Sequence, residues 1–405
     1  MSTTVSPKTA LPPLPPGEAP RLPWLALIVL ASTTFVALVS ELLPAGLLTP
    51  MADDLGVSES GAGQLVTVYA LASAFTAVPL IGLTRGVSRR RLLIVVVIGF
   101  AVGNALTAVV QGYELMLVVR LFAGVVTGLI WSMVGGYAAA MVPDELRGRA
   151  LAIALGGASI GFTVGVPLSA GIGALIGWRA AFAGLAAIGV LGLVAVMAVL
   201  PEVPGEPEED REPFFSVLLR PGVLAVAVVT FTVIVGHYTL YTYIDPFVQR
   251  AGLENGVGFA LALFGGGTVV AVAVVGPFID RDLRRTLLVV LAAIAASLAV
   301  LGVFGSSPAV LLAVCLPWGV AYGALPPIVQ TASVRVGGAA ADVAVSTTVT
   351  AWSFGIGIGA VAGGVAFDAR GAGVLPWTAF ALTVVAIAGV LVARRGFPRG
   401  AAAAA

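Results

Sequence analysis

Long apolar runs occupy most of the 405-residue chain, and short polar, glycine-rich or proline-containing stretches separate them. A helix needs about 20 apolar residues to cross the hydrocarbon core of a bilayer, and each run is long enough for one crossing. The pattern predicts twelve membrane-spanning helices, near 24–51, 61–83, 91–111, 114–141, 149–175, 178–200, 222–246, 257–279, 286–305, 308–332, 341–367 and 375–393.

The composition indicates the solvent around these runs. Hydrophobic residues make up 59% of the chain, charged residues only 10%, and the mean hydropathy is +1.07. A water-soluble protein of this size needs far more charge to cover its surface, so most of the chain is expected to face lipid. The net charge of +1 gives no reason to expect nucleic acid as a partner, and the single cysteine, Cys315, excludes an intramolecular disulfide.

The basic residues predict the orientation of the spans. Of the 21 lysines and arginines, 17 fall in loops and tails on one side of the twelve spans, and Arg120 lies inside a span. The three on the opposite side are Arg179, Arg250 and Arg370. Because loops rich in Lys and Arg stay in the cytoplasm, both termini are expected there, in a plasma or inner membrane that the chain crosses many times.

Two polar stretches divide the chain into parts. The proline-rich start contains "LPPLPPGEAP", and "PEVPGEPEEDREPF" follows the sixth span. The predicted parts are a disordered cytoplasmic tail (1–22), an N-terminal six-helix bundle (23–200), a cytoplasmic linker (201–220), a C-terminal six-helix bundle (221–393) and a cytoplasmic tail (394–405).

The second bundle repeats features of the first. "GLTRGVSRRRLL" begins at Gly82, and "GPFIDRDLRRTLL" begins 194 residues later, at Gly276. The same offset relates two further pairs of glycines, Gly161 with Gly355 and Gly165 with Gly359. Two parallel repeats facing each other are a common design for transport by alternating access.

Glu41 stands past the middle of the first predicted span. A charge at the bilayer centre costs at least about 2.5–3.5 kcal/mol, so acids inside membranes tend to be functional. Burial disfavours the charged form of a carboxyl group, which suits an acid that binds and releases a proton during a cycle. The alternative is an acid near the outer headgroups that only reaches toward water.

The seventh predicted span carries "GHYTLYTYID". His237, Tyr241 and Asp245 would share one face of a continuous helix, with Tyr238 and Tyr243 beside them. Aromatic rings with hydroxyls suit a partly apolar substrate, whereas the alternative for the residues near the helix end is an aromatic belt at the outer membrane surface. Weaker candidates for the cavity, each equally compatible with packing between helices, are Gln64, Tyr69, Asn104, Trp131, Trp318, Tyr322, Gln330 and Trp352.

Small residues recur every four positions on three predicted spans, for example Gly124 and Gly128 on the fourth. Such stripes let helix backbones approach closely. Gly161 and Gly165 belong to the stripe on the fifth span, where Pro167 is expected to bend the helix. A second interpretation is that these smooth contacts let the helices slide.

The residues needed for several enzymatic sites are missing from the sequence. The single lysine, Lys8, does not follow a glycine-rich loop, so the chain has no P-loop for ATP. With one cysteine and one histidine there is no metal-binding cluster of these residues. The sequence therefore predicts neither an enzyme nor a metal or other cofactor.

Four stretches resemble motifs of the major facilitator superfamily. They are the basic loop "GLTRGVSRRR", "RLFAGVVTG" around Arg120, "GFTVGVPLSAG" around Gly165, and "ELLPAGLLTPMADDLGVS" from Glu41. The closest likeness is to the twelve-span drug:proton antiporters, in the branch of sugar efflux, nucleoside efflux and chloramphenicol resistance, over about residues 24–393. One departure is Gly86, which occupies the place of the acid in the family's basic loop.

The resemblance implies an all-α integral membrane protein with 12 transmembrane helices in two pseudo-symmetric six-helix bundles. It implies a monomer that exports small molecules such as drugs, sugars or nucleosides in exchange for protons. The residues that would serve proton coupling are Glu41, Arg120 and Asp245, with Glu41 and Arg120 in the same outer half of the cavity and able to pair. Those that would line the substrate cavity are His237, Tyr238, Tyr241, Trp131, Trp318 and Tyr322. Those that would serve gating are Arg85, Arg89, Arg90, Gly161, Gly165, Pro167, Asp280, Arg281 and Arg284.

Two other functions are compatible with the sequence. A proton symporter that imports a sugar or nucleoside would use the same fold, although the antiporter-like motif in the fifth span favours export. A membrane receptor or scaffold would bind without transporting, but the loops are too short to hold a signalling domain. The direction of proton movement on addition of substrate separates these possibilities.

Overall fold

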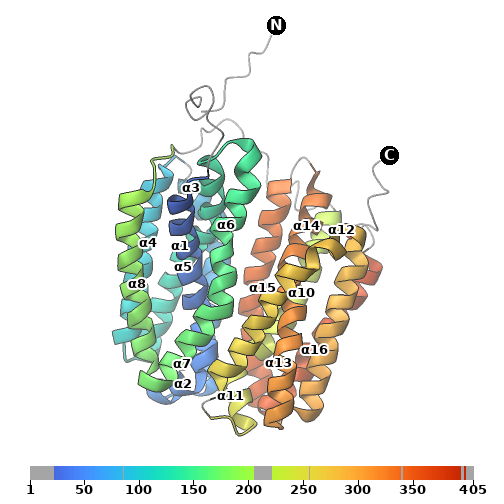
Figure 1. Cartoon of the computed structure of the whole chain (residues 1–405). Helices are drawn as coiled ribbons and strands as arrows, with labels where there is room; N and C mark the ends of the chain where they lie inside the picture. The colour runs from blue at the N-terminus through green and yellow to red at the C-terminus, as the bar shows by residue number, and fades with distance from the viewer. Residues whose placement is uncertain are drawn as a thin grey trace.

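The computed structural model consists of two helical bundles that stand side by side, as the blue-to-green and yellow-to-red halves of Figure 1 show. It describes residues 22–84, 86–204, 221–254, 256–338, 341–393 and 396–397. The predicted N-terminal tail, most of the linker and most of the C-terminal tail lie outside these residues, as does Arg85. We call residues 22–204 the N-half and residues 221–397 the C-half.

Every regular element in the described part of the chain is helical. The N-half contains α1 (Trp24–Leu42), η1 (Leu43–Leu47), α2 (Leu48–Leu55), α3 (Glu59–Thr84), α4 (Arg89–Val109), α5 (Tyr113–Ala140), η2 (Asp144–Leu146), α6 (Arg147–Ile160), η3 (Gly161–Gly165), α7 (Val166–Ile176) and α8 (Trp178–Val199). The C-half contains α10 (Pro221–Tyr241), α11 (Ile244–Arg250), α12 (Val257–Phe304), α13 (Pro308–Gly323), α14 (Leu325–Gly337), α15 (Ala341–Arg370), η5 (Ala372–Val374) and α16 (Leu375–Val392).

All twelve predicted spans fall on these helices. Ten helical segments of the described residues are long and apolar enough to cross a membrane, and a pair bent by 43° at 272 brings the number to eleven. The remaining predicted span, 61–83, lies in α3, which that count does not include. The predicted spans 257–279 and 286–305 both lie in α12, which is interrupted by non-helical backbone at Asp282. The prediction of an all-helical membrane protein is confirmed.

The pseudo-symmetry of the halves is visible in equivalent hydrogen bonds. Arg90, in the first turn of α4, donates to the carbonyl of Met197 in the last turn of α8. In the C-half Arg284 donates to the carbonyl of Leu391 in the last turn of α16, at 2.8 Å. Both residues of this second pair lie 194 positions after the first. Each arginine occupies carbonyls that a helix end leaves without an intrahelical partner.

Close backbone contacts repeat in the same way. Gly124 and Gly128 of α5 lie directly against the backbone of α3 at Tyr69 and Ser73. The C-half equivalents, 195 residues later, are Gly319 and Gly323 of α13 against the backbone of α12 at Phe264 and Thr268. A side chain at these glycines would overlap the neighbouring backbone, so the glycine stripes do provide close helix packing.

Irregular backbone interrupts several spans, including the first, the fifth and the seventh. In α1–α2 the break is the 3₁₀ turn η1, which contains Pro44, and the C-half equivalent is the turn at Thr242 and Tyr243 between α10 and α11. The fifth span contains the π-helical turn η3, in which the Val166 amide bonds to the carbonyl of Gly161. The predicted irregularity therefore lies just before Pro167, which is in the first turn of the regular helix α7. Proline has no N–H for the preceding turn, and a π turn accommodates this loss.

Candidate functional site

Glu41 lies in the last turn of α1, immediately before the break at η1. Its side chain is buried, with 4% of the residue exposed. The indole Nε1 of Trp131, on α5, donates a hydrogen bond to Glu41 Oε2 at 3.3 Å. Two residues predicted for different roles, coupling and cavity lining, are therefore in direct contact.

Arg120, on α5, is completely buried, but it does not pair with Glu41. Ion pairs of the described residues include those of Arg90 and Arg91 with Glu202 and of Arg179 with Asp54, and none joins Arg120 to Glu41. The expected ion pair between Arg120 and Glu41 is therefore wrong for this conformation.

The backbone explains where Arg120 points instead. Its Nη1 donates to the carbonyl of Ser40 at 3.2 Å and its Nε to the carbonyl of Leu65 at 3.3 Å. In a regular helix the Ser40 carbonyl would accept from the amide four residues later, but that residue is Pro44, which has none. The guanidinium also lies 4.2 Å from the ring centre of Tyr69, a favourable position for a cation.

Further hydrogen bonds connect the helices around Arg120. The hydroxyls of Tyr69 (α3) and Thr127 (α5) are 2.6 Å apart, and the Ser40 hydroxyl donates to Asn104 Oδ1 of α4 at 2.8 Å. Tyr69 and Asn104 were weak candidates from sequence. We call this set the polar cluster, made of Ser40, Glu41, Tyr69, Asn104, Arg120, Thr127 and Trp131.

The C-half places aromatic rings around His237, near the end of α10. The imidazole stacks on Tyr322 of α13 with ring centres 3.7 Å apart, and on Tyr241 at 5.1 Å. Trp318 and Tyr238 lie at 5.3 and 5.1 Å from the imidazole, so the four aromatic residues predicted for the cavity here are brought together.

Two residues of this group were not predicted from sequence. Phe264 of α12 stacks on His237 at 5.7 Å, and Phe162 of η3 stacks on Tyr241 and Tyr322 at 5.6 and 5.7 Å. Phe162 comes from the N-half and reaches across the seam between the halves. We call His237, Tyr238, Tyr241, Phe264, Trp318, Tyr322 and Phe162 the aromatic box. Phenylalanine is common in any membrane helix, so only the repeat, which aligns Phe264 with Tyr69, could have identified one of them.

The aromatic box contains polar atoms without partners. Both ring nitrogens of His237 and the indole nitrogen of Trp318 are buried and make no hydrogen bond to the described residues. Buried polar atoms of proteins are normally paired, so each exception needs an explanation, and a bound ligand is one. The box adjoins the polar cluster, because Phe162 belongs to η3, whose Gly165 lies directly against Val39 of α1, two residues before Glu41.

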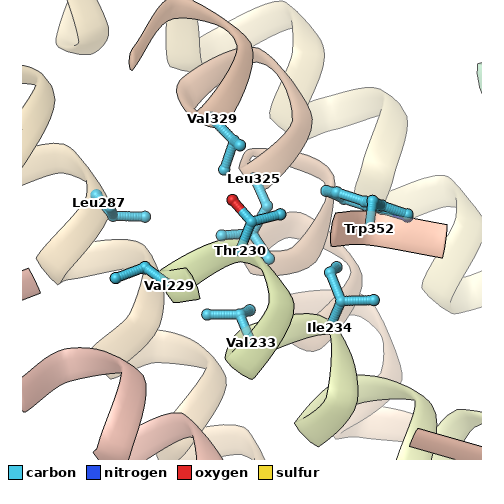
Figure 2. A pocket seen from close by; sticks show the side chains of 8 residues that line it. All are labelled: Val229, Thr230, Val233, Ile234, Leu287, Leu325, Val329 and Trp352. Carbon is cyan, nitrogen blue, oxygen red and sulfur yellow. The ribbon is translucent and has the colours of Figure 1, made fainter. Parts of the chain in front are cut away.

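A small apolar cavity lies beside the aromatic box. Figure 2 shows its lining, which is Val229, Thr230, Val233, Ile234, Leu287, Leu325, Val329 and Trp352. Its volume is about 10 Å³, which is room for about one water molecule. Trp352, a weak candidate from sequence, also contacts Tyr322, with ring centres 6.1 Å apart. This cavity is too small for an organic substrate in the present conformation.

Asp245 lies apart from the other two predicted coupling residues. Because α10 ends at Tyr241 and α11 begins only at Ile244, Asp245 leaves the helix face that His237 and Tyr241 share. Its Oδ2 accepts the backbone amide of Thr49 at 2.8 Å. The expectation of a continuous face through Asp245 is wrong, because the helix breaks before reaching it.

The described residues that were predicted for gating lie at the arginine-rich end, in η3 and in the first turn of α7. The backbone amide of Arg89 donates to the carbonyl of Val203 at 2.9 Å, and Arg281 is exposed. Gly161 and Gly165 pack against α1, and Pro167 is buried. The side chain of Asp280 lies outside the described residues, as does Arg85.

The basic loop before α4 has Gly86 at the position of the motif's acid, but a carboxylate from another part of the chain lies near its arginines. Glu202, after α8, lies 4.0 Å from Arg90 and 3.9 Å from Arg91. Exposed pairs of this kind contribute at most about 1 kcal/mol, so the bond from Arg90 to the α8 carbonyl is the firmer contact.

Comparisons with known proteins agree with this geometry. The family described as Major Facilitator Superfamily matches residues 29–360. Curated relatives include the purine ribonucleoside efflux pump NepI of Salmonella paratyphi C and that of Salmonella typhi, each 30% identical over 85% of this chain and 87% of the relative. Among solved structures, a bacterial homolog of the human lysosomal transporter Spinster, in an inward-facing and unoccupied conformation, superposes with a TM-score of 0.74. That likeness has 16% sequence identity and covers 93% of this chain and 98% of the other.

Proposed function

Since the chain belongs to the Major Facilitator Superfamily, a family of transporters, we propose that it exports nucleosides or similar ring-containing small molecules in exchange for protons. The observation that carries the proposal is the meeting of the polar cluster and the aromatic box at the seam between the halves. One group can hold a proton, and the other can hold a planar ring. The nucleoside pumps among its relatives support this choice of cargo.

The aromatic box suits a nucleobase. Stacking of a base on an aromatic side chain contributes about 1–3 kcal/mol and works with every base, because every base has a π face. The unpaired nitrogens of His237 and Trp318 supply hydrogen-bonding positions for the base edge. A ligand that pairs them removes the cost of burying them alone.

Glu41 is the proposed proton site. It is a buried carboxyl group that accepts a hydrogen bond from a neutral donor, the Trp131 indole. Such a group exchanges a proton when water or substrate reaches it. One charge that crosses 100 mV releases about 2.3 kcal/mol, so a proton gradient equivalent to about 150 mV would support roughly a 300-fold gradient of neutral cargo at one-to-one exchange.

The arginine distribution supports a cytoplasmic location of both termini. Arg89, Arg90 and Arg284 lie where α8 and α16 end, whereas Arg179 and Arg250 lie at the other end of the bundles, next to Asp54 and Gly373 respectively. By the positive-inside rule the first end faces the cytoplasm. We further propose that residues 201–220 link the halves there, in a chain that works as a monomer in the cell membrane.

Transport in liposomes tests this function. Purified protein would be reconstituted with a pH-sensitive dye inside, and adenosine, inosine or ribose would be added outside. We expect the two nucleosides, but not ribose, to move protons opposite to the cargo, because ribose has no ring system to stack. Proton movement in the same direction as the cargo would indicate an importer, and equal responses to ribose and nucleosides would contradict the role of the aromatic box.

A further inference from the structure

The two halves touch through a hydrogen bond at the end opposite the arginine-rich end. Asp245, in the first turn of α11, accepts the amide of Thr49, in the first turn of α2, with 2.8 Å between Oδ2 and N. Asp245 is buried, with 2% exposed, and its other oxygen accepts the side-chain amide of Gln249 at 2.9 Å. The carboxylate is therefore held in place from its own helix while it bonds across the seam.

The helix geometry explains why the Thr49 amide needs a partner. The first amides of a helix have no intrahelical acceptor, and α2 has no capping side chain at Leu47. Pro50 follows directly and has no amide. Asp245 thus caps α2 from the opposite half of the molecule, where its negative charge also meets the positive end of the helix.

Thr49 and Asp245 occupy equivalent positions of the repeat. In the N-half Gly161 packs on Phe35, and in the C-half the equivalent Gly355 packs on Phe231, which aligns α1 with α10 at an offset of 196. Thr49 and Asp245 are also 196 residues apart. A contact between equivalent residues lies on the pseudo-two-fold axis, where the halves must separate if the cavity is to open at this end.

Tyr243 closes the seam beside this bond. Its hydroxyl donates to the carbonyl of Ala360 on α15 at 3.0 Å. Its ring fills the space next to Gly63 of α3, where a β-carbon would overlap it. The two closely spaced residues Tyr243 and Asp245 therefore both bridge the halves from the break between α10 and α11.

We infer that Asp245 is a latch: by capping α2 across the seam it holds this end of the transporter closed, and it acts as a positioning residue for the conformational change. The bond must break each time the cavity opens here. Asp245 thus sets the balance between the two access states, whatever the cargo is.

Cysteine labelling tests the latch. In a Cys315→Ala background, Leu261→Cys places a thiol beneath the latch, since Leu261 is buried and packs on Gly46 across the seam. An impermeant maleimide would be applied to whole cells. Thiols at exposed Glu254 and Glu145, near opposite ends, report which end faces outward and so test the proposed orientation separately.

Four variants separate the latch from other effects. Asp245→Ala removes the acceptor. Thr49→Pro removes the amide donor in the first turn of α2 and also strains Leu48, because a following proline disfavours the helical backbone that Leu48 has. Thr49→Ala keeps the amide and is the matched control. Asp245→Asn retains a neutral acceptor of the same shape. It takes the place of Asp245→Ala in the test if Asp245→Ala does not fold.

We expect Asp245→Ala and Thr49→Pro each to speed labelling of Leu261→Cys by about tenfold or more, the factor for losing one charge-assisted hydrogen bond. The double variant should label no faster than either single variant, Thr49→Ala should match the unmodified background, and Asp245→Asn should fall between. The latch would be overturned if either Asp245→Ala or Thr49→Pro left the labelling rate unchanged. It would also be overturned if the two substitutions increased the labelling rate additively in the double variant.

Discussion

The two halves use the same backbone contacts to carry opposite kinds of side chain. The glycine contacts align Tyr69 with Phe264 and Thr127 with Tyr322, and they align Arg120 with Cys315. The alignment of α1 with α10 likewise pairs Glu41 with His237. The N-half therefore holds a carboxylate where the C-half holds the stacked ring of His237, and a guanidinium where the C-half holds a cysteine.

This difference shows how a duplicated scaffold can divide its tasks. A buried cation needs oxygen partners, and the N-half provides them through the carbonyl that Pro44 leaves free. At the equivalent C-half position the small side chain of Cys315 needs no such partner. The unpaired nitrogens of His237 and Trp318 are then available to a planar ligand, whereas in the N-half two backbone carbonyls hold the Arg120 guanidinium in a place suited to charge.

The largest expected effect tests whether the close glycine contacts are equally important for folding in the two halves. Gly124→Val and Gly319→Val each push a side chain into the backbone of the neighbouring helix. Overpacking costs about 1–3 kcal/mol or more, and backbone cannot move aside cheaply, so we expect both variants to lose most of their folded yield.

The matched control for these variants is Gly136→Val, since no atom lies near that glycine. Its thermal midpoint in detergent should equal that of the unmodified protein. If only one of the two close-contact variants were destabilised, the packing would not be equivalent in the halves.

The second-largest expected effect tests whether the aromatic box of the C-half, and not the polar cluster of the N-half, binds the cargo. Tyr322→Ala removes a ring that stacks on His237, whereas Thr127→Ala alters the equivalent position in the N-half. With stacking worth about 1–3 kcal/mol per base, nucleoside affinity should fall about 5- to 150-fold in Tyr322→Ala. Calorimetric titration with adenosine should show less than about a threefold change in Thr127→Ala, and equal losses would break the comparison.

The substitution with the smallest expected effect makes one position of the N-half resemble its C-half equivalent. Tyr69→Phe supplies the residue that the C-half has at position 264, and it removes the hydroxyl bonded to Thr127. The net loss of one hydrogen bond is about 1 kcal/mol, so the thermal midpoint should fall by only a few degrees. A fall as large as that of Gly124→Val would mean that the hydroxyl holds the helices together.

Much of the fold could be predicted from sequence because lipid imposes a strong pattern. The lengths of the apolar runs predicted the spans. The offset of 194 residues, which the basic loops share with two pairs of glycines, predicted the repeat. Glu41 and His237 were recognisable because a titratable group is costly in a membrane helix.

The remaining features depend on local breaks in helices, which hydropathy does not report. The partner of Arg120 depends on the carbonyl freed by Pro44, and the position of Asp245 depends on the break after Tyr241. Phe162 joins the aromatic box because η3 carries it across the seam, which requires the three-dimensional arrangement of the halves.

The most direct test of the division of tasks separates cargo binding from proton coupling in one variant. Glu41→Gln keeps an acceptor for the Trp131 indole but cannot release a proton, and Glu114→Gln, at an exposed position of α5, is the control. In dye-loaded liposomes we expect Glu41→Gln to bind adenosine within about threefold of the unmodified protein and to exchange labelled adenosine, but to move no protons and build no gradient. Proton-driven uphill transport at the unmodified rate in Glu41→Gln would contradict the account.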